Sequence, residues 1–276
     1  MDEFESICRK IKSVQIQGAE NVAKSSVKAL RIKNDKKSIQ KLLSLRPTEP
    51  ALRNVVNFIK DDPCKLGTQA LKHFSESDKM MAEYGARKIE DGMTVFTHCH
   101  SSNVIAVLKK AKEEGKKFKV YCTETRPLFQ GRKTAKDMAK LKIPVTMFVD
   151  SGARIALKDS DLFMFGADAI TSEGKVVNKI GTEMFAEVAD KYDTDSYCCT
   201  DSWKYDPETV FGKKEPIEIR NPGEIWKEQP KGVKIMNLAF EGVDPDLITG
   251  IITELGVHPP EVFVQEVRKA YPWMNP

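Results

Sequence analysis

The side chains best suited to chemistry lie close together in residues 97–103, which read Thr-His-Cys-His-Ser-Ser-Asn. The apolar run Met-Thr-Val-Phe at 93–96 precedes them, and apolar residues at helical spacing follow from Val104 onward. A strand that leads into a helix places polar groups at the carboxyl edge of a doubly wound sheet. The Cys99 thiol would then lie at the strand tip, where the unpaired amides of Ser101, Ser102 and Asn103 could hold a phosphate oxygen. We therefore predict a thiol beside an anion-binding site.

The reactive groups in this segment also have structural interpretations. Free cysteine is among the most buried residue types, so Cys99 could serve packing alone, and both interpretations stay open at this point. His98 and His100 suggest a metal site, but adjacent residues on an extended segment point in opposite directions. No CxxC pair occurs among the six cysteines, so structural zinc is not expected. We predict no metal site.

Hydrophobic periodicity predicts the elements that position these side chains. Residues 2–88 carry apolar stripes at spacings of three and four, which indicate several helices. From Asp91 onward, short apolar runs alternate with helical segments, and this alternation is typical of βαβ units in a mainly parallel sheet covered on both faces. The sequence therefore predicts an all-helical N-terminal domain (residues 1–89) followed by an α/β domain (residues 90–276).

The loops that leave the predicted strands should meet at one edge of that sheet. They bring Arg126, Asp150, Asp168 and Lys204 toward Cys99. Three of them also have structural interpretations: Asp168 could cap a turn, Arg126 could pair with Glu124, and Lys204 could be an ordinary surface residue. Arg46, before a proline, could likewise be an exposed helix end. Strands are predicted at residues 95–96, 118–121, 145–149, 162–165, 197–199 and 234–238, with later helices near 179–192 and 261–271.

The composition is that of a soluble globular protein, with 41% hydrophobic and 30% charged residues and no biased tract. The net charge of +4 comes from lysines spread along the whole chain, which favours a solvated surface over a nucleic-acid partner. No apolar run approaches the ~20 residues of a membrane helix, and the first residues are not a signal peptide. We therefore expect a cytoplasmic protein with reduced cysteines and no membrane partner.

Four segments, in order along the chain, carry a resemblance to a known superfamily. They are Thr-His-Cys at 97–99, Glu-Thr-Arg-Pro-Leu-Phe-Gln-Gly at 124–131, Gly-Ala-Asp at 166–168 and Asn-Lys-Ile-Gly-Thr at 178–182. The chain resembles the superfamily shared by the regulatory subunits of translation initiation factor 2B, methylthioribose-1-phosphate isomerases and archaeal ribose-1,5-bisphosphate isomerases. The resemblance covers nearly the whole chain and implies a helical N-terminal domain followed by a Rossmann-like domain.

Cys99 and Asp168 together make the chain similar to the isomerases, because the non-catalytic initiation-factor subunits commonly lack the cysteine. Lys204, where ribose-1,5-bisphosphate isomerases have a phosphate-binding lysine, makes it more similar to that group. The resemblance implies that Cys99 and Asp168 are catalytic. The implied substrate contacts are Gln17, Gly18, Ala19, Glu20, Arg46, Ser101, Ser102, Asn103, Asn178, Lys179 and Lys204. Gln17 and Glu20 depart from the usual arginine and glycine, so this loop has lost a positive charge.

The implied reaction converts α-D-ribose 1,5-bisphosphate to D-ribulose 1,5-bisphosphate through a cis-phosphoenolate, in the degradation of nucleoside monophosphates. Asp168 would need a raised pKa to protonate the ring oxygen, and Cys99 would need to form a thiolate readily. No cofactor is expected, because the oxidation is internal to the sugar. The family also implies homo-oligomers, as dimers and as hexamers built from three dimers. A methylthioribose-1-phosphate isomerase and a non-catalytic regulatory subunit remain the alternatives.

Overall fold

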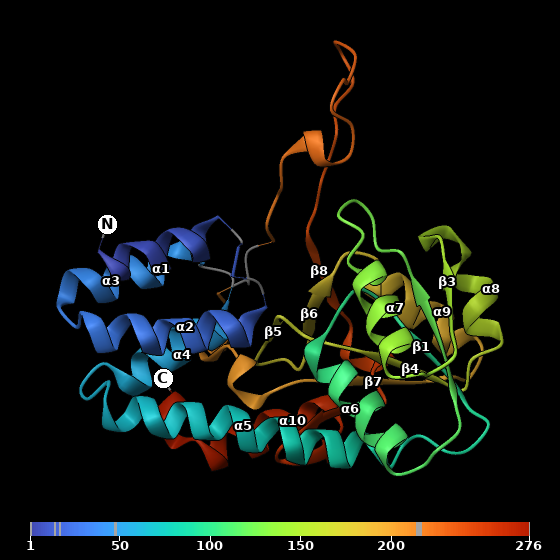
Figure 1. The fold of residues 1–276 in the computed structure, drawn as a ribbon, viewed down its shortest axis with the longest axis horizontal. Coiled ribbons are helices and arrows are strands. Elements are labelled where there is room, and N and C mark those ends of the chain that lie inside the picture. Colours follow the sequence, from blue (N-terminus) through green and yellow to red (C-terminus); the bar gives the residue numbers. More distant parts are fainter. Residues whose placement is uncertain (1, 14, 17, 47–48, 214–216, 276) are drawn as a thin grey trace.

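Among the residues that the structure describes, five helices form the first third of the chain, on one side of the molecule (Figure 1). The computed structural model describes residues 2–13, 15–16, 18–46, 49–213 and 217–275. Local capping sets helix ends: the Asp35 carboxylate accepts a hydrogen bond from the Ser38 amide (2.8 Å) at the start of the third helix. The predicted all-helical N-terminal region is confirmed. Its helices are α1 (Glu3–Lys12), α2 (Ala19–Ile32), α3 (Lys36–Leu45), α4 (Pro50–Ile59) and α5 (Lys65–Ala86).

The main sheet has the strand order β10-β9-β7-β4-β1-β2-β3 in the described part of the chain. Neighbouring strands run parallel except β9 and β10. The central strands β1 and β4 are buried along their whole length, as expected for a sheet covered on both faces. The predicted parallel sheet is thus confirmed, although β9 and β10 were not predicted. Its strands are β1 (Thr94–Thr97), β2 (Lys119–Thr123), β3 (Val145–Phe148), β4 (Leu162–Phe165), β7 (Asp195–Cys199), β9 (Gly250–Thr253) and β10 (Gly256–His258).

A small antiparallel sheet, in the order β5-β6-β8, lies beside the main sheet. It consists of β5 (Ala169–Ile170), β6 (Val176–Lys179) and β8 (Phe240–Val243). The prediction of a strand at 234–238 is wrong. β6 ends at Lys179, which pairs with Phe240, so the preceding residues have no long partner strand and form only an isolated bridge between Leu238 and Ile219. The apolar Met236 in that stretch is 56% exposed.

Helices cover both faces of the main sheet (Figure 1). Side chains of α5, α6 and α7 pack with Val95, Val120 and Met164 on one face. Side chains of α8 and α9 pack with Phe96 and Phe163 on the other. None of the described helices is both long and apolar enough to cross a membrane. The remaining helices are α6 (Ser102–Glu113), α7 (Gly131–Lys140), α8 (Ala153–Lys158), α9 (Thr182–Lys191) and α10 (Pro260–Ala270), and short 3₁₀ turns are η1 (Asp150–Gly152), η2 (Ser202–Lys204), η3 (Pro207–Phe211), η4 (Pro222–Glu224), η5 (Pro245–Leu247) and η6 (Pro272–Met274).

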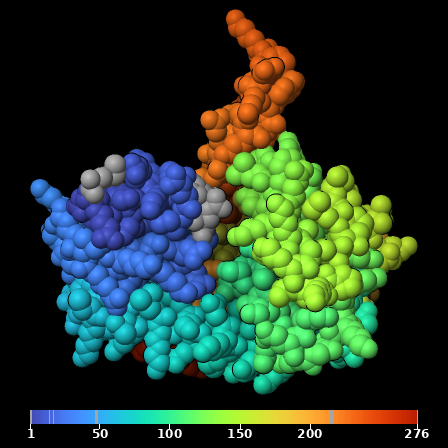
Figure 2. Space-filling view, in the orientation of Figure 1, coloured from blue at the N-terminus to red at the C-terminus, as the bar shows by residue number. Residues whose placement is uncertain are grey.

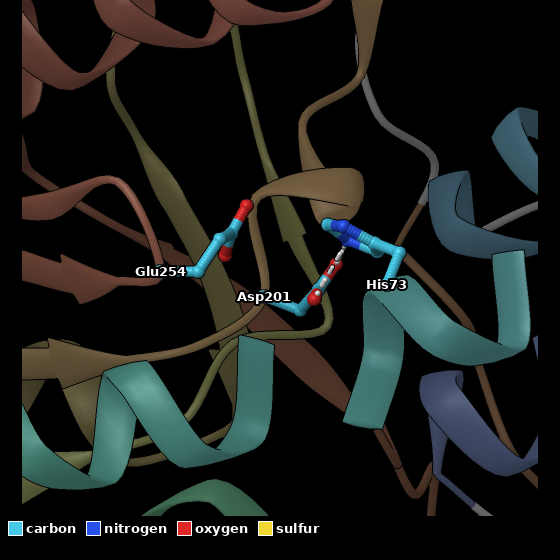
Figure 3. Close-up of side chains that lie close together, drawn as sticks. All are labelled: His73, Asp201 and Glu254. Carbon is cyan, nitrogen blue, oxygen red and sulfur yellow. Dashed lines mark hydrogen bonds and ion pairs between the residues drawn. The ribbon is translucent and has the colours of Figure 1, made fainter. Parts of the chain in front are cut away.

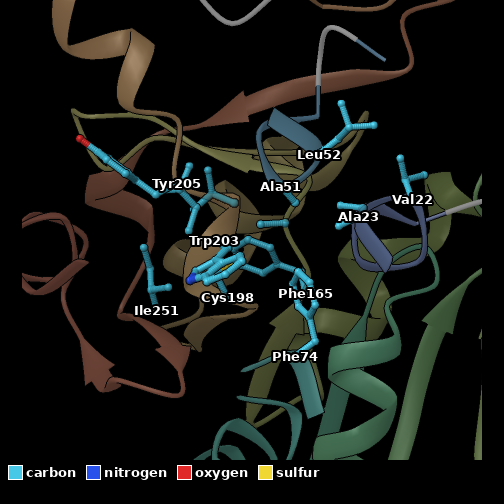
Figure 4. Close-up of a cluster of buried hydrophobic side chains, with 14 of the residues drawn as sticks. Val22, Ala23, Ala51, Leu52, Phe74, Phe165, Cys198, Trp203, Tyr205 and Ile251 are labelled. Carbon is cyan, nitrogen blue, oxygen red and sulfur yellow. The ribbon is translucent and has the colours of Figure 1, made fainter. Parts of the chain in front are cut away.

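One apolar core joins the N-terminal helices to the sheet. It extends from Phe4 in α1 to Phe263 in α10 and includes Trp203, which is only 3% exposed. Figure 4 shows Trp203 beside Phe74 of α5, with residues of α2, α4 and the sheet around them. The Phe74 and Trp203 rings lie 5.5 Å apart in an edge-to-face arrangement. The division into residues 1–89 and 90–276 stays a prediction.

A long arm separates η3 from β8. It extends away from the body of the molecule, as the orange segment at the top of Figure 1 shows. The exposed apolar residues Trp226 and Met236 lie along it. At the base of the arm, Arg220 forms a two-pronged ion pair with Glu224, with N–O distances of 2.7 and 2.9 Å. Asn237, on the returning limb, donates to Glu224 (3.2 Å) and to the Asn221 carbonyl (2.9 Å), which ties the two limbs together before β8 begins.

Candidate active site

A cavity of about 410 Å³ lies between the N-terminal helices and the carboxyl edge of the main sheet. Figure 2 shows a hollow where the N-terminal helices in blue face the green segments of the sheet region. Gln17, one of the predicted contacts, lies outside the described residues. The other catalytic and substrate-contact residues that the resemblance implies all line the cavity: Gly18, Ala19, Glu20, Arg46, Cys99, Ser101, Ser102, Asn103, Asp168, Asn178, Lys179 and Lys204. Arg126 and Asp150, which were also expected at this edge, are not part of its lining; the Arg126 amide donates to the Asp150 carboxylate instead (2.7 Å).

The backbone at Cys99 is held in an unusual conformation at the tip of β1. Its φ of 65° lies in the left-handed region, which is uncommon for a residue with a side chain. Two hydrogen bonds hold it there: the Cys99 amide donates to Thr125 Oγ1 (3.0 Å), and Thr134 Oγ1 donates to the Cys99 carbonyl (2.8 Å). Backbone strain of this kind persists only where the surroundings enforce it, and it clusters at functional sites.

His98 is fixed by the protein and is not available to a ligand. Burial lowers its pKa to about 4, so the ring is neutral. Its Nε2 lies 3.0 Å from the Ile180 carbonyl, which can only accept, and Nδ1 lies 2.6 Å from Thr123 Oγ1. The proton is therefore on Nε2, and Thr123 donates to Nδ1. His100 contacts a different residue, Thr134, at 3.2 Å.

The Cys99 thiol is harder to ionise than expected. Burial raises its pKa to about 11, although the positive charge of Lys179 acts in the opposite direction. Burial therefore opposes the readily formed thiolate that the implied mechanism requires. The loss of hydration on burial raises the pKa of the thiol by more than the nearby cation and the start of α6 lower it.

Asp168 lies between the end of β4 and the start of β5, the first strand of the small sheet. Its amide donates a hydrogen bond to the Val177 carbonyl (2.8 Å), which fixes the turn. Burial raises the pKa of its carboxyl, while the positive charges of Lys204, Lys179 and Arg46 oppose this change. The direction is the one expected for a group that must donate a proton near neutral pH. The Asp168 charge also raises the pKa of Cys99, which is consistent with two groups in one cavity.

Lys204 is buried in the cavity wall, so its interpretation as a surface residue is wrong. It is 6% exposed, and Nζ donates to the Ala167 carbonyl (2.8 Å) and to Asn103 Oδ1 (3.2 Å). The turn that carries it is tied to α4, because Asn54 Nδ2 donates to the carbonyls of Trp203 and Tyr205, both at 2.8 Å. These bonds hold the ammonium beside Asp168.

Arg46 also faces the cavity instead of forming an exposed helix end. It pairs with Glu49 at 2.6 Å, and Glu49 is only 3% exposed. Burial raises the pKa of Glu49 to about 7, with Arg46 acting against it. Glu49 was not predicted as a site residue. The sequence showed only an acid between Arg46 and the start of α4, and acids are common at the starts of helices because of the helix dipole.

The other predicted contacts are held by local bonds. The Ser101 hydroxyl accepts from the Val104 amide at the start of α6 (3.4 Å), and Asn178 Nδ2 donates to Thr182 Oγ1 (3.1 Å). Lys179 Nζ lies 4.6 Å from the centre of the Phe240 ring. Glu20 is paired with Lys24. Further cavity residues, which were not predicted as substrate contacts, come from helices, loops, a strand and the arm: Ser13, Asn21, His100, Leu128, Gln130, Lys133, Gly166, Ala167, Arg220, Glu224 and Phe240.

His73, Asp201 and Glu254 form a cluster that could hold a metal ion (Figure 3). One potential ligand atom from each lies within 4.8 Å of the others. The protein supplies partners for most of their oxygens: Asp201 Oδ1 accepts from His73 and from the Trp203 amide (2.8 Å), and Glu254 accepts from the hydroxyls of Ser77 and Tyr271, both at 2.8 Å. Asp201 Oδ2 forms no hydrogen bond with the described residues but lies 3.1 Å from His73 Nε2 in an ion pair. Burial alone would lower the pKa of His73, but the Asp201 carboxylate raises it. The three side chains are best explained as a buried hydrogen-bond network next to the η2 turn, which carries Lys204.

Comparison with known proteins agrees with this architecture. The chain is 35% identical to the ribose 1,5-bisphosphate isomerase of Methanocaldococcus jannaschii, over 100% of this chain and 97% of that one. It is 34% identical to the methylthioribose-1-phosphate isomerase of Thermosipho africanus, over 76% of this chain and 64% of that one. A crystal structure of translation initiation factor eIF-2B from Pyrococcus horikoshii OT3 superposes with a TM-score of 0.86 at 27% identity, covering 96% and 100% of the two chains. The model of the initiation factor 2 subunit family matches residues 5–260. The chain therefore belongs to the initiation factor 2 subunit family.

Proposed function

We propose that this protein is a ribose-1,5-bisphosphate isomerase, which converts α-D-ribose 1,5-bisphosphate to D-ribulose 1,5-bisphosphate. The observation that carries the proposal is that Cys99 and Asp168, from loops 69 residues apart in sequence (168 − 99), line one cavity. The likeness to ribose 1,5-bisphosphate isomerases over the full chain supports it. The cavity also contains three lysines and two arginines, which suits an anionic sugar: Lys133, Lys179, Lys204, Arg46 and Arg220.

The reaction needs four proton transfers, and two groups can perform them. The Asp168 carboxyl donates to the ring oxygen as the bond from C1 to that oxygen breaks, and the Cys99 thiolate takes the proton from C2. This gives the cis-phosphoenolate in its protonated enol form, with the proton still on the 2-hydroxyl. The Cys99 thiol then returns its proton to C1, while the Asp168 carboxylate takes the proton of the 2-hydroxyl as the ketone forms. Both groups end as they began, and no external oxidant is needed.

The starting state for this cycle carries the proton on Asp168 and the negative charge on Cys99. Burial raises both pKa values, so it stabilises the protonated Asp168 carboxyl and destabilises the Cys99 thiolate. The positive charge of Lys179 and a bond from the His100 backbone both stabilise the thiolate, since both lower the pKa of Cys99. We therefore assign Lys179 two tasks in the proposed mechanism, phosphate binding and support of the Cys99 thiolate.

A methylthioribose-1-phosphate isomerase would use the same pair on a different sugar. Its substrate carries an apolar methylthio group in place of the 5-phosphate, so one end of its site should be apolar. Here Arg46 and Lys204 line the cavity together with Asp168, and their positive charges oppose the rise in the pKa of its carboxyl. These cations favour a second phosphate over a methylthio group.

A coupled assay for ribulose 1,5-bisphosphate, with the methylthio sugar run in parallel, tests the proposal. We expect turnover of ribose 1,5-bisphosphate, and loss of it in Cys99→Ser and in Asp168→Asn with the fold intact. Cys64→Ser and Asp159→Asn are matched controls, because both residues are exposed. Near-wild-type rates in either site variant would contradict the assigned roles, and preference for the methylthio sugar would contradict the substrate.

We also propose that the protein forms homo-oligomers, as dimers that assemble into hexamers, in the cytoplasm. Exposed apolar side chains support a contact between copies at the edge of the main sheet. Met147 and Val149, on and after the edge strand β3, are 46% and 58% exposed, and Ile155 of α8 is 69% exposed. Such a patch at a sheet edge is typical of an interface. Sedimentation equilibrium measures the assembly directly.

A further inference from the structure

Asp78, in α5, does not line the cavity but contacts a residue that does. Asn103 Nδ2 donates a hydrogen bond to Asp78 Oδ1 (3.2 Å). The other end of the same amide, Asn103 Oδ1, accepts from Lys204 Nζ (3.2 Å). Lys204 Nζ in turn donates to the carbonyl of Ala167, the residue before Asp168 (2.8 Å). We propose that Asp78 is a positioning residue, which orients the Asn103 amide and through it the Lys204 ammonium. This inference rests on the proposed function.

The chemistry of an amide explains why Asn103 needs a partner on its far side. One end of the group donates and the other accepts, so the side chain can face Lys204 in two ways. Only the orientation with Oδ1 toward Lys204 pairs a donor with an acceptor. Asp78 selects it, because its carboxylate accepts from Nδ2. Asn103 is 2% exposed and Lys204 is 6% exposed, so water has little access to replace the bond between them, whereas the bond from Asn103 to Asp78 is partly buried.

The packing of α5 against α6 places Asp78 within reach. Gly85 lies seven residues after Asp78, which is two helical turns and therefore the same face of α5. A Cβ atom at Gly85 would lie 2.5 Å from a methyl carbon of Val107 in α6. The missing side chain lets the two helices approach closely. Asn103, four residues before Val107, then lies beside Asp78 at the start of α6.

A second carboxyl contacts Asp78 from the cavity side. Glu20 of α2 lines the cavity and lies close enough to Asp78 for its negative charge to raise the pKa of that carboxyl. Burial and the Glu20 carboxylate raise the pKa of Asp78 to about 6, while Lys24 opposes them. An asparagine at position 78 could donate to Glu20 and still accept from Asn103. It is therefore the conservative substitution that keeps both contacts, whereas a leucine of similar size keeps neither.

The test is a double-mutant cycle between Asp78 and Lys204. We expect Asp78→Leu to lower kcat/KM about tenfold, mainly through KM, because a misplaced ammonium loses a charge-assisted bond to phosphate. In the background of Lys204→Met, the same change should have little further effect. Asp78→Asn should stay within about threefold of wild type. Glu76→Leu, at an exposed acid of the same helix, is the matched control.

A purely structural role for Asp78 gives a different result. It would add its full effect to Lys204→Met, since changes at independent sites add. Additive losses would overturn the proposal, and so would an unchanged KM in Asp78→Leu or an Asp78→Asn variant as weak as Asp78→Leu.

A second measurement needs no turnover and separates this inference from the proposed function. Lys204 Nζ is held by two hydrogen bonds, so reductive methylation with formaldehyde and cyanoborohydride, followed by mass spectrometry, should be slow at this site. We expect Asp78→Leu to raise its rate severalfold and Glu76→Leu to leave it unchanged. An unchanged rate in Asp78→Leu would overturn the link to Lys204. Absence of ribose bisphosphate turnover in the wild-type protein would overturn the proposed function alone.

Discussion

Replacement of Asn54 by alanine should both destabilise the protein and disturb the site. Asn54 is 3% exposed, and its Nδ2 donates to the carbonyls of Trp203 and Tyr205 at 2.8 Å. Both carbonyls belong to residues that are at most 3% exposed, so water has little access to replace the lost donor. Because these residues flank Lys204, the loss should reach the cavity as well as the core.

The magnitude follows from the cost of leaving buried acceptors without partners. An unsatisfied buried polar group costs ~1–3 kcal/mol, so two carbonyls predict a loss of about 2–5 kcal/mol after some relaxation. This is a large part of the ~5–15 kcal/mol that stabilises a typical domain. Asn34→Ala is the matched control. Its Nδ2 also donates to one carbonyl, that of Lys60 at 2.8 Å, but the bond is exposed and should be worth under about 1 kcal/mol.

Urea unfolding followed by circular dichroism measures both free energies of unfolding, and the isomerase assay gives kcat/KM under conditions where each variant is folded. We expect Asn54→Ala to lose stability and to show a raised KM, while Asn34→Ala does neither. A difference of less than about 0.5 kcal/mol between the two variants would refute the reasoning, because it would mean that other groups satisfy the two carbonyls.

Two further predictions concern stability. A Cβ atom at Gly131 would lie 1.7 Å from the Thr123 carbonyl oxygen, so Gly131→Ala should cost more than about 4 kcal/mol and leave little folded protein in thermal melts. Gly152→Ala, with its nearest neighbour at 3.6 Å, should stay within about 1 kcal/mol, and equal losses would contradict the steric argument. The pKa of Glu49 rises from 4.5 to about 7, so the folded state holds a proton that the unfolded state releases between these pH values. Wild-type stability should therefore fall relative to Glu49→Gln as pH rises through this window, by up to ~3 kcal/mol, and parallel pH profiles would contradict the raised pKa.

The sequence predicted the parts of the fold that depend on local pattern. The apolar runs at β1 and β4 are buried along their whole length, as expected for strands covered on both faces, while the edge strand β3 is partly exposed. The run at 234–238 has a similar composition but lies on the arm, where no long partner strand is available. Strand pairing is a long-range property, so composition alone could not separate the two cases.

The candidate site was predictable to the extent that parallel strands share an edge. That rule places Cys99, Asp168 and Lys204 around one cavity. It gives no information on Glu49 or Arg220, which reach the cavity from a helix cap and from the base of the arm. The direction of the Cys99 pKa shift could not be predicted from the sequence either, because it depends on how completely the folded chain excludes water from the thiol.

The continuous apolar core limits how a sugar could enter. If the N-terminal helices swung away from the sheet as a rigid lid, Phe74 and Trp203 would be exposed to water together. Each large side chain uncovered in this way costs ~1.5–3 kcal/mol, and many others would follow. Wide opening is therefore a rare event. Ligand exchange should instead depend on small movements at the rim, where long side chains such as Lys133 and Leu128 border the cavity.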